Sequence, residues 1–270
     1  MATENSAGGS TVSRRAVARG GAVLAAALAS GGGATISAAA AAGSTFVVAH
    51  GAWSSGWAWK KMHPLLAARG HRLVTPSYTG LGERAHLARA EIDLDTHIMD
   101  VVNVLEYEDL RDVVLIGHSY GGIVATGIAD RARERLRRLI YLDAFVPEDG
   151  QSLADLAGGE AGLRARAVDG WRVPPNPVPD DTPAEDRGWI EARRLHQSIA
   201  TFVQPLKLTR GPLTLPRDYV LCTKSDTFGA YANRAREMGW PVHELDSSHS
   251  PHITAPEPLA ALLDRIVAGA

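Results

Sequence analysis

The order of apolar and helical segments constrains the fold of this chain more than any other feature of its sequence. From Ser44 onward, short apolar runs alternate with longer segments in which apolar residues recur at helical spacing. Apolar runs without polar alternation are typical of a parallel sheet whose two faces are covered by helices. The sequence therefore predicts the α/β class with a mostly parallel central sheet. We expect strands at 45–49, 72–76, 113–116, 139–142, 219–222 and 242–245, and helices at 56–69, from Asp95, at 119–132 and from Pro256.

Size and charge exclude several other classes of protein. A length of 270 residues with 45% hydrophobic residues suits one large domain with a sizeable core. The formal net charge is −2, which gives no reason to expect a nucleic-acid partner. The single cysteine, Cys222, precludes an intramolecular disulfide, and its apolar neighbours indicate a small buried side chain.

Residues 1–43 do not resemble part of the fold. An arginine pair, Arg14 and Arg15, precedes a weakly apolar Ala/Gly stretch and small residues that offer cleavage sites. This order resembles a twin-arginine signal, although Val17 and Ala18 stand where phenylalanine and leucine are common. We expect a signal peptide and export to the periplasm or the exterior of a bacterium, the alternative being an Ala/Gly-rich tail. The apolar stretch is too short for a stable membrane anchor.

The segment of about 147–216 interrupts the alternation of strands and helices. It is rich in proline, glycine and charge. A loop of this length in a compact domain is usually functional or disordered, and Trp171, Trp189 and Phe202 argue against disorder. We expect a cap inserted over the carboxyl edge of the sheet, where open α/β folds bind ligands; a flexible surface excursion is the alternative.

The sharpest chemical signal is the sequence Gly117-His118-Ser119-Tyr120-Gly121-Gly122. It follows an apolar strand and opens a helix, which is the setting of a nucleophile elbow. Glycines are needed there because side chains at 117 or 121 would collide with the neighbouring strand or helix. We predict Ser119 as a nucleophile.

A serine hydroxyl needs a base, and the base must be oriented by an acid. His249, in a Ser-rich loop after the last strand, is the preferred base, and His252, near the start of the terminal helix, is the alternative. Two aspartates follow strands. Asp226 is the preferred acid because its strand directly precedes the strand that leads to His249, whereas we expect Asp143 to bond backbone near the elbow.

An oxyanion formed at Ser119 needs backbone donors. The amide of Tyr120, directly after the nucleophile, is one candidate. The other is the amide of Ala52, in the loop after the first strand, where Gly51 permits close approach. For the wall of the substrate pocket we expect three aromatic residues: Trp53, Trp171 and Trp189.

With these residues in hand, the chain resembles a subfamily of the α/β-hydrolase superfamily, that of plant hydroxynitrile lyases, methylsalicylate-type esterases and bacterial esterase relatives. The resemblance covers most of 46–268 and implies an α/β-hydrolase domain over 44–270. It assigns Ser119, Asp226 and His249 to a catalytic triad and the amides of Ala52 and Tyr120 to the oxyanion hole. The motifs that carry it are His50 to Trp53, Thr79 to Gly82, Asp112 to Gly122, Tyr141 to Pro147 and His249 to His252.

These observations predict a carboxylic ester hydrolase that acts on a small hydrophobic or aromatic ester through an acyl-enzyme. We expect no metal and no organic cofactor, and neither a nucleic-acid nor a membrane partner. The rivals are a hydroxynitrile-lyase-like carbon–carbon lyase and a non-catalytic binding protein. The lyases resembled here have threonine at the position of Gly51 and lysine at the position of Ser250, which disfavours the lyase.

Overall fold

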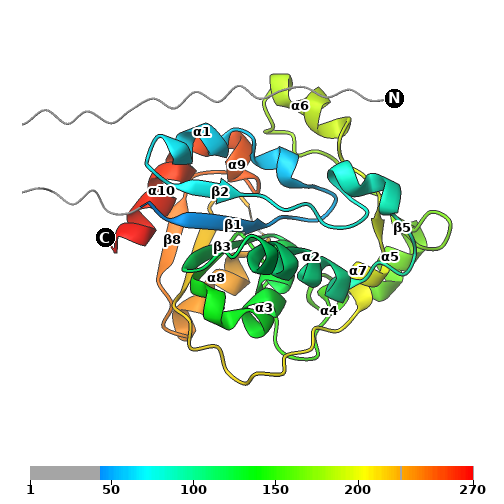
Figure 1. Cartoon of the computed structure of the whole chain (residues 1–270). Helices are drawn as coiled ribbons and strands as arrows, with labels where there is room; N and C mark the ends of the chain where they lie inside the picture. The colour runs from blue at the N-terminus through cyan, green and yellow to red at the C-terminus, as the bar shows by residue number, and fades with distance from the viewer. Residues whose placement is uncertain (1–42, 226, 270) are drawn as a thin grey trace, which may run out of the picture. The chain divides into compact units, whose positions relative to one another are not determined.

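A sheet of six parallel strands organises the protein, as seen in a computed structural model that describes residues 43–225 and 227–269 (Figure 1). The strand order is β2-β1-β3-β4-β7-β8, and every neighbouring pair is parallel. The predicted class and the parallel sheet are confirmed. The strands are β1 (Thr45–Ala49), β2 (Arg72–Val74), β3 (Val113–His118), β4 (Leu136–Leu142), β7 (Arg217–Cys222) and β8 (Val242–Leu245).

Successive strand residues point to opposite faces of the sheet, so the two faces carry separate apolar cores. Val47, Leu115 and Tyr219 belong to one core, which α2 (Leu94–Tyr107), α3 (Gly121–Arg131) and α8 (Gly229–Glu237) cover. Val48 and Ile116 belong to the other, which α1 (Met62–Ala67) and α10 (Pro256–Ala268) cover. Figure 1 shows these two helical layers on opposite sides of the strands.

The prediction of one continuous helix over 56–69 is wrong. The structure has a short 3-10 helix, η1 (Gly56–Trp59), followed by α1, which begins only at Met62. Pro64 explains the break because proline lacks an N–H and is tolerated only in the first turn of a helix. The helix expected from Asp95 begins at Leu94, with the Asp93 carboxylate accepting a hydrogen bond from the Thr96 amide.

The segment between β4 and β7 is largely structured. It holds two antiparallel strands and four helices, and Figure 1 places β5, α5 and α7 beyond the end of the sheet toward which the β1 arrow points. Val173, Ile199 and Phe202 of this segment are buried in the core that contains α2 and α3. The elements are α4 (Leu153–Leu156), α5 (Glu160–Arg166), β5 (Arg172–Val173), α6 (Ala184–Glu191), β6 (Gln197–Ser198) and α7 (Ala200–Val203).

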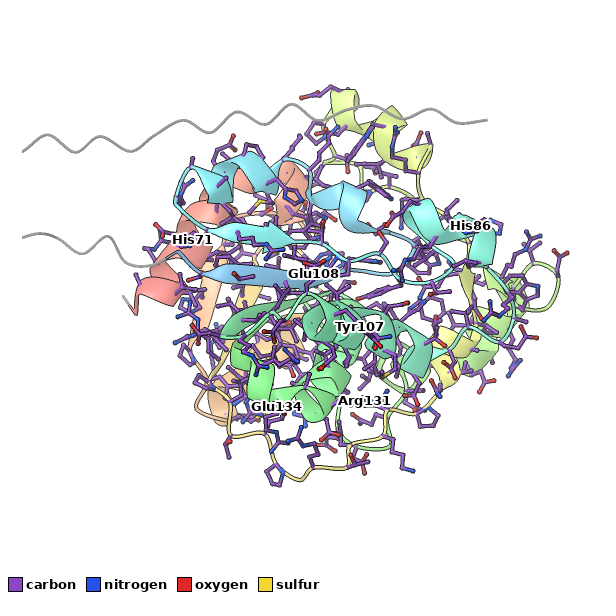
Figure 2. All side chains as sticks on the ribbon, in the orientation of Figure 1. His71, His86, Tyr107, Glu108, Arg131 and Glu134 are labelled. Atoms are coloured by element: carbon purple, nitrogen blue, oxygen red, sulfur yellow. The ribbon has the colours of Figure 1, made fainter. Side chains whose placement is uncertain are left out.

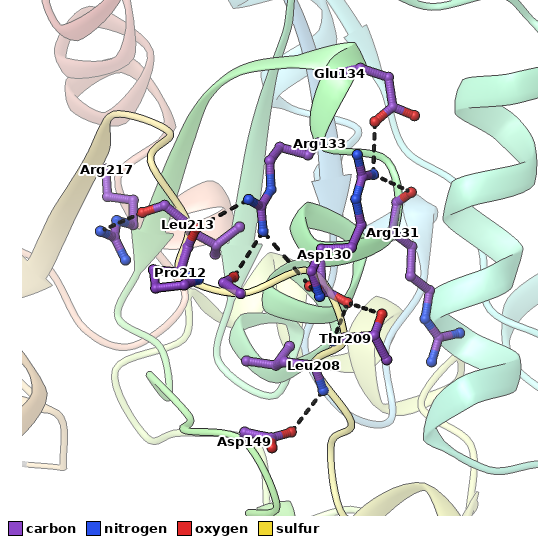
Figure 3. Close-up of polar contacts among 12 residues, drawn as sticks. Asp130, Arg131, Arg133, Glu134, Asp149, Leu208, Thr209, Pro212, Leu213 and Arg217 are labelled. Atoms are coloured by element: carbon purple, nitrogen blue, oxygen red, sulfur yellow. Dashed lines mark hydrogen bonds and ion pairs between the residues drawn. The ribbon is translucent and has the colours of Figure 1, made fainter.

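Polar contacts hold the stretch of chain before β7 against the end of α3 (Figure 3). The buried Asp130 carboxylate, at the end of α3, accepts from the amides of Thr209 (2.9 Å) and Arg210 (3.0 Å), and Arg133 donates to the carbonyl of Pro212 (3.1 Å). An exposed ion pair joins Arg72 of β2 to Glu108, the residue directly after α2. The Glu108 side chain is labelled in Figure 2. The remaining short elements are η2 (Gly82–Leu87), η3 (Arg133–Arg135) and α9 (Pro251–Thr254).

Of the 43 residues predicted as a signal peptide, 1–42 lie outside the described residues. Within the part that the structure describes, no helix is both long enough and apolar enough to cross a bilayer.

Candidate active site

Ser119 stands at the sharp turn between β3 and α3. Its φ angle of 55° lies in the left-handed region, which costs free energy for a residue with a side chain and is typical of functional sites. A side chain at Gly121 would collide with the carbonyl of Ala49, and one at Gly117 would meet the Ala125 methyl group at 2.8 Å. The expected steric role of both glycines is confirmed.

His249 lies in the loop between β8 and α9, with its imidazole between two hydrogen-bond partners. Its Nε2 is 2.9 Å from Ser119 Oγ, and its Nδ1 is 2.7 Å from Asp143 Oδ2. The ring stacks on Phe228, with centroids 5.0 Å apart and planes 10° apart. His118 Nε2 lies 2.7 Å from the backbone oxygen of His249, so a contact to the loop backbone also restrains the imidazole.

The alternative base, His252, has a different environment. Its ring stacks on Trp59 at a centroid distance of 4.5 Å and is buried. Burial lowers the pKa of His252 to about 3, with the nearby His249 as a second cause. The structure therefore brings His249, not His252, to the serine hydroxyl.

Asp143 is fully buried at the end of β4 and has a φ of 42°. One carboxylate oxygen accepts from the Cys222 amide (3.1 Å), as expected for a backbone-bonding residue, and the other contacts His249. The preferred acid, Asp226, lies outside the described residues. The expected backbone bond of Asp143 is therefore present, and its second oxygen is in addition held against the imidazole.

Strand register explains why Asp143 is close to the elbow. His118 of β3 pairs with Leu142 of β4, so the next residue on each strand, Ser119 and Asp143, leaves the sheet at the same level. Adjacency of β3 and β4 and this register are tertiary properties. The one sequence signal was that Asp143 directly follows an apolar strand.

The loop after β1 lies against the nucleophile. A side chain at Gly51 would approach the Ser119 Cβ to 3.4 Å. Trp53, with a φ of 58°, donates its amide to Gln197 Oε1 (2.8 Å) and its indole N–H to the Val173 carbonyl (3.0 Å). Among the described residues, the amides of Ala52 and Tyr120 donate no hydrogen bond.

The buried side chain of His97 contacts the hydroxyl of Tyr120. That hydroxyl is 2.9 Å from Nδ1 of His97, and the His97 ring stacks on Tyr78 at 4.5 Å. Burial lowers the pKa of His97 to about 3, which keeps the ring neutral at physiological pH. Neither His97 nor His118 was singled out from sequence as a supporting residue, although His118 lies inside the elbow motif.

A cavity of about 610 Å³ opens over Ser119 and His249. Its wall is mainly apolar and includes Trp53, as expected. The other two tryptophans expected there are not among the lining residues. Trp171 borders a separate small hollow. Trp189 packs edge-on against Trp57, and it is Trp57 that lines the cavity. Other apolar lining residues include Phe145, Leu153, Leu163, Ile190, Phe202 and Phe228.

This strand–turn–helix serine, joined to an imidazole and a buried carboxylate, is the arrangement of α/β hydrolases. The chain belongs to the Alpha/beta hydrolase family, whose sequence profile matches residues 46–262. The resemblance noted from the motifs is therefore confirmed at the level of the superfamily.

Relatives span nearly the whole domain. The chain is 38% identical over 237 residues to the carbendazim hydrolyzing esterase of Nocardioides sp. (strain SG-4G), covering 82% of this chain and 98% of the relative. Its fold is similar to that of an extracellular α/β-hydrolase from a Paenibacillus species (TM-score 0.70, 25% identity, 82% of this chain and 97% of the other). It is also similar to the methylesterase MES16 from Arabidopsis (TM-score 0.68, 26% identity, 84% of this chain and 100% of the other).

Proposed function

We propose that this protein hydrolyses carboxylic esters with Ser119 as nucleophile, His249 as general base and Asp143 as the acid that orients the base. The observation that carries the proposal is the hydrogen-bond chain from Ser119 Oγ through the His249 imidazole to Asp143 Oδ2, with distances of 2.9 and 2.7 Å. These are the separations at which a base can take the proton of an attacking hydroxyl.

The reaction has two halves. Ser119 Oγ attacks the acyl carbon while His249 Nε2 takes its proton and then gives that proton to the departing alkoxide. A water molecule, deprotonated by His249, then attacks the acyl carbon. The bond from that carbon to Ser119 Oγ breaks, His249 returns the proton to Oγ, and the acid is released. Asp143 accepts from Nδ1 and stabilises the imidazolium that forms in each half.

Asp143 replaces Asp226 as the proposed acid because its carboxylate lies within hydrogen-bonding distance of His249 Nδ1. Nδ1 has one hydrogen to donate, so one carboxylate satisfies it. The second oxygen of Asp143, held by the Cys222 amide, fixes the direction from which the carboxylate approaches.

For the oxyanion we propose the amides of Ala52 and Tyr120. Both residues line the cavity that contains Ser119. Their backbone donors have no partner among the described residues, and fixed, unpaired donors beside a nucleophile stabilise a developing negative charge. The contact between Tyr120 and His97 keeps that end of the elbow in place.

Ester hydrolysis is favoured over the two rival functions. Ser250, which follows His249 and lines the cavity, is neutral and cannot supply the cation that a lyase needs for a departing cyanide. A pure binding protein has no use for the strained φ of Ser119 or for a buried carboxylate behind an imidazole. The relatives named as a carbendazim hydrolyzing esterase and a methylesterase lend further support, and the apolar wall suits a hydrophobic or aromatic ester.

We further propose that residues 1–43 direct export, which is supported by the arginine pair in the sequence and by the extracellular relative from Paenibacillus. Replacing Arg14 and Arg15 by lysine should leave the protein in the cytoplasmic fraction. Unchanged export of that variant would contradict the proposal.

Labelling with a fluorophosphonate probe tests the catalytic proposal. The native protein should be labelled at Ser119, and Ser119→Ala should be neither labelled nor able to release p-nitrophenolate from acyl esters. Ser54→Ala is the matched control because Ser54 lines the same cavity, and its labelling should persist. A folded Ser119→Ala protein with near-native ester turnover would refute the assignment.

A further inference from the structure

Two arginines give the cavity a charge that ester chemistry at Ser119 does not use. Arg166, the last residue of α5, and Arg194, which follows α6, both line the cavity. Their guanidinium carbons lie 5.7 and 5.8 Å from the Trp53 ring centroid. Among the lining residues that the structure describes, these two arginines are the side chains with a permanent charge.

Neither arginine has a carboxylate partner among the described residues. Arg166 donates to Asn176 Oδ1 (2.8 Å) and to the Pro174 carbonyl (2.6 Å), and Arg194 donates to the Asn176 carbonyl (2.5 Å). Asn176 therefore contacts both guanidinium groups. Arg164, two residues before Arg166 on α5, shows the ordinary arrangement, an ion pair with Glu160.

Leaving a partly buried cation such as Arg194 without an anion is costly, whereas Arg166 is exposed. Arg194 is partly buried, and that burial lowers the pKa of its guanidinium. A single hydrogen bond among the described residues uses one of the five N–H donors of that group. Removal of a cation from water is usually offset by a paired anion, and a neutral amide could make the same contact to the Asn176 carbonyl.

We propose that Arg166 and Arg194 form a subsite for a carboxylate, so that the preferred substrates are esters that carry a second, anionic group away from the scissile bond. Guanidinium groups match the planar geometry of carboxylates. Both arginines line the same cavity as Ser119 and Trp53, so one bound ester can reach the nucleophile and the subsite together. The inference rests on the proposed ester hydrolysis and specifies its substrate class.

Matched substrate pairs test the inference from both sides of the ester. On the acyl side, mono-p-nitrophenyl esters of dicarboxylic acids of increasing length are compared with the same compounds whose free carboxyl is a methyl amide. On the alcohol side, acetate esters of 4-hydroxyphenylalkanoic acids are compared with their methyl amides. In at least one series the native enzyme should favour the charged member by about 10- to 100-fold in kcat/KM, mainly through KM.

Variants connect the preference to the two arginines. Arg194→Gln and Arg166→Gln should each reduce the ratio of charged to neutral kcat/KM, and the double variant should bring it near one. Each ratio is taken within one variant, so a general change in activity cancels. Arg194→Lys, which keeps the charge, should retain part of the preference. Arg193→Gln is the matched control because Arg193 donates to the Trp189 carbonyl and is exposed outside the cavity lining; it should keep the native ratio.

The outcomes separate this inference from the proposed function. Two results would overturn the carboxylate subsite and leave ester hydrolysis standing. In the first, the enzyme hydrolyses neutral esters but does not prefer the charged member of either series. In the second, the preference survives in the double variant. If no ester reacts, calorimetric titration of Ser119→Ala with the dicarboxylic acids decides the subsite: binding lost on adding Arg194→Gln supports it, and no binding overturns it.

Discussion

Replacing Asp143 by asparagine tests the site most directly, because the structure dictates how the new amide must orient. Oδ1 of Asp143 accepts from the Cys222 amide, so asparagine must keep its carbonyl there and turn its NH₂ toward His249 Nδ1. Nδ1 then has to accept, and the imidazole proton moves to Nε2. In that tautomer Nε2 donates to Ser119 Oγ and cannot take its proton.

We expect kcat to fall by about 10⁴-fold, equivalent to about 5 kcal/mol of transition-state stabilisation, which is the scale of loss when a triad histidine is held in the wrong tautomer. The loss should appear in kcat rather than KM because the cavity wall is unchanged. Asp226→Asn is the matched control and should stay within about tenfold of the native rate, since Asp143 already occupies Nδ1.

The assay is p-nitrophenyl butyrate hydrolysis at saturating substrate, with circular dichroism and thermal unfolding to show that both variants fold. Fluorophosphonate labelling of the same samples reports the reactivity of Ser119 directly. The reverse pattern, a large loss in Asp226→Asn with near-native activity in Asp143→Asn, would refute the assignment of Asp143 and restore the acid that the sequence favoured.

Three further predictions concern stability and support of the site. Gly121→Ala should destabilise the fold by about 3 kcal/mol or more in urea unfolding, because its methyl group meets the Ala49 carbonyl, whereas Gly188→Ala, with open space around it, should be neutral or slightly stabilising. His118→Leu should lower kcat by about tenfold, because it removes the contact to the His249 carbonyl, and His118→Asn should recover part of that activity; equal rates for native and Leu enzymes would contradict this role. Acidification from pH 7 to pH 5 should lower the free energy of unfolding, since three buried histidines have folded pKa values of about 3 to 4 and take up protons only when the chain unfolds below about pH 6.5. These histidines are His50, His97 and His252. Each should lower the free energy of unfolding by up to about 2 kcal/mol at pH 5. A urea midpoint that does not change over this pH range would contradict their burial as neutral rings.

Local sequence was sufficient for much of the fold and for two members of the site. Unbroken apolar strands that alternate with helices are typical of a parallel sheet with helices on both faces. The glycines around Ser119 leave one turn conformation, and the position of His249 after the last strand brings it to the same edge of the sheet. Even the break before α1 could have been read from Pro64.

Tertiary structure decided what depends on distance between remote segments. Asp143 and Asp226 both follow apolar strands, and the sequence cannot show that β4 lies beside β3 in the register that aligns Leu142 with His118. The same holds for the segment between β4 and β7, where Trp189 packs on Trp57 while Arg166 and Arg194 each lie near the Trp53 ring. Residue type and local spacing determine which chemistry a chain can perform, whereas strand order, register and packing determine which of its equivalent residues come within hydrogen-bonding distance.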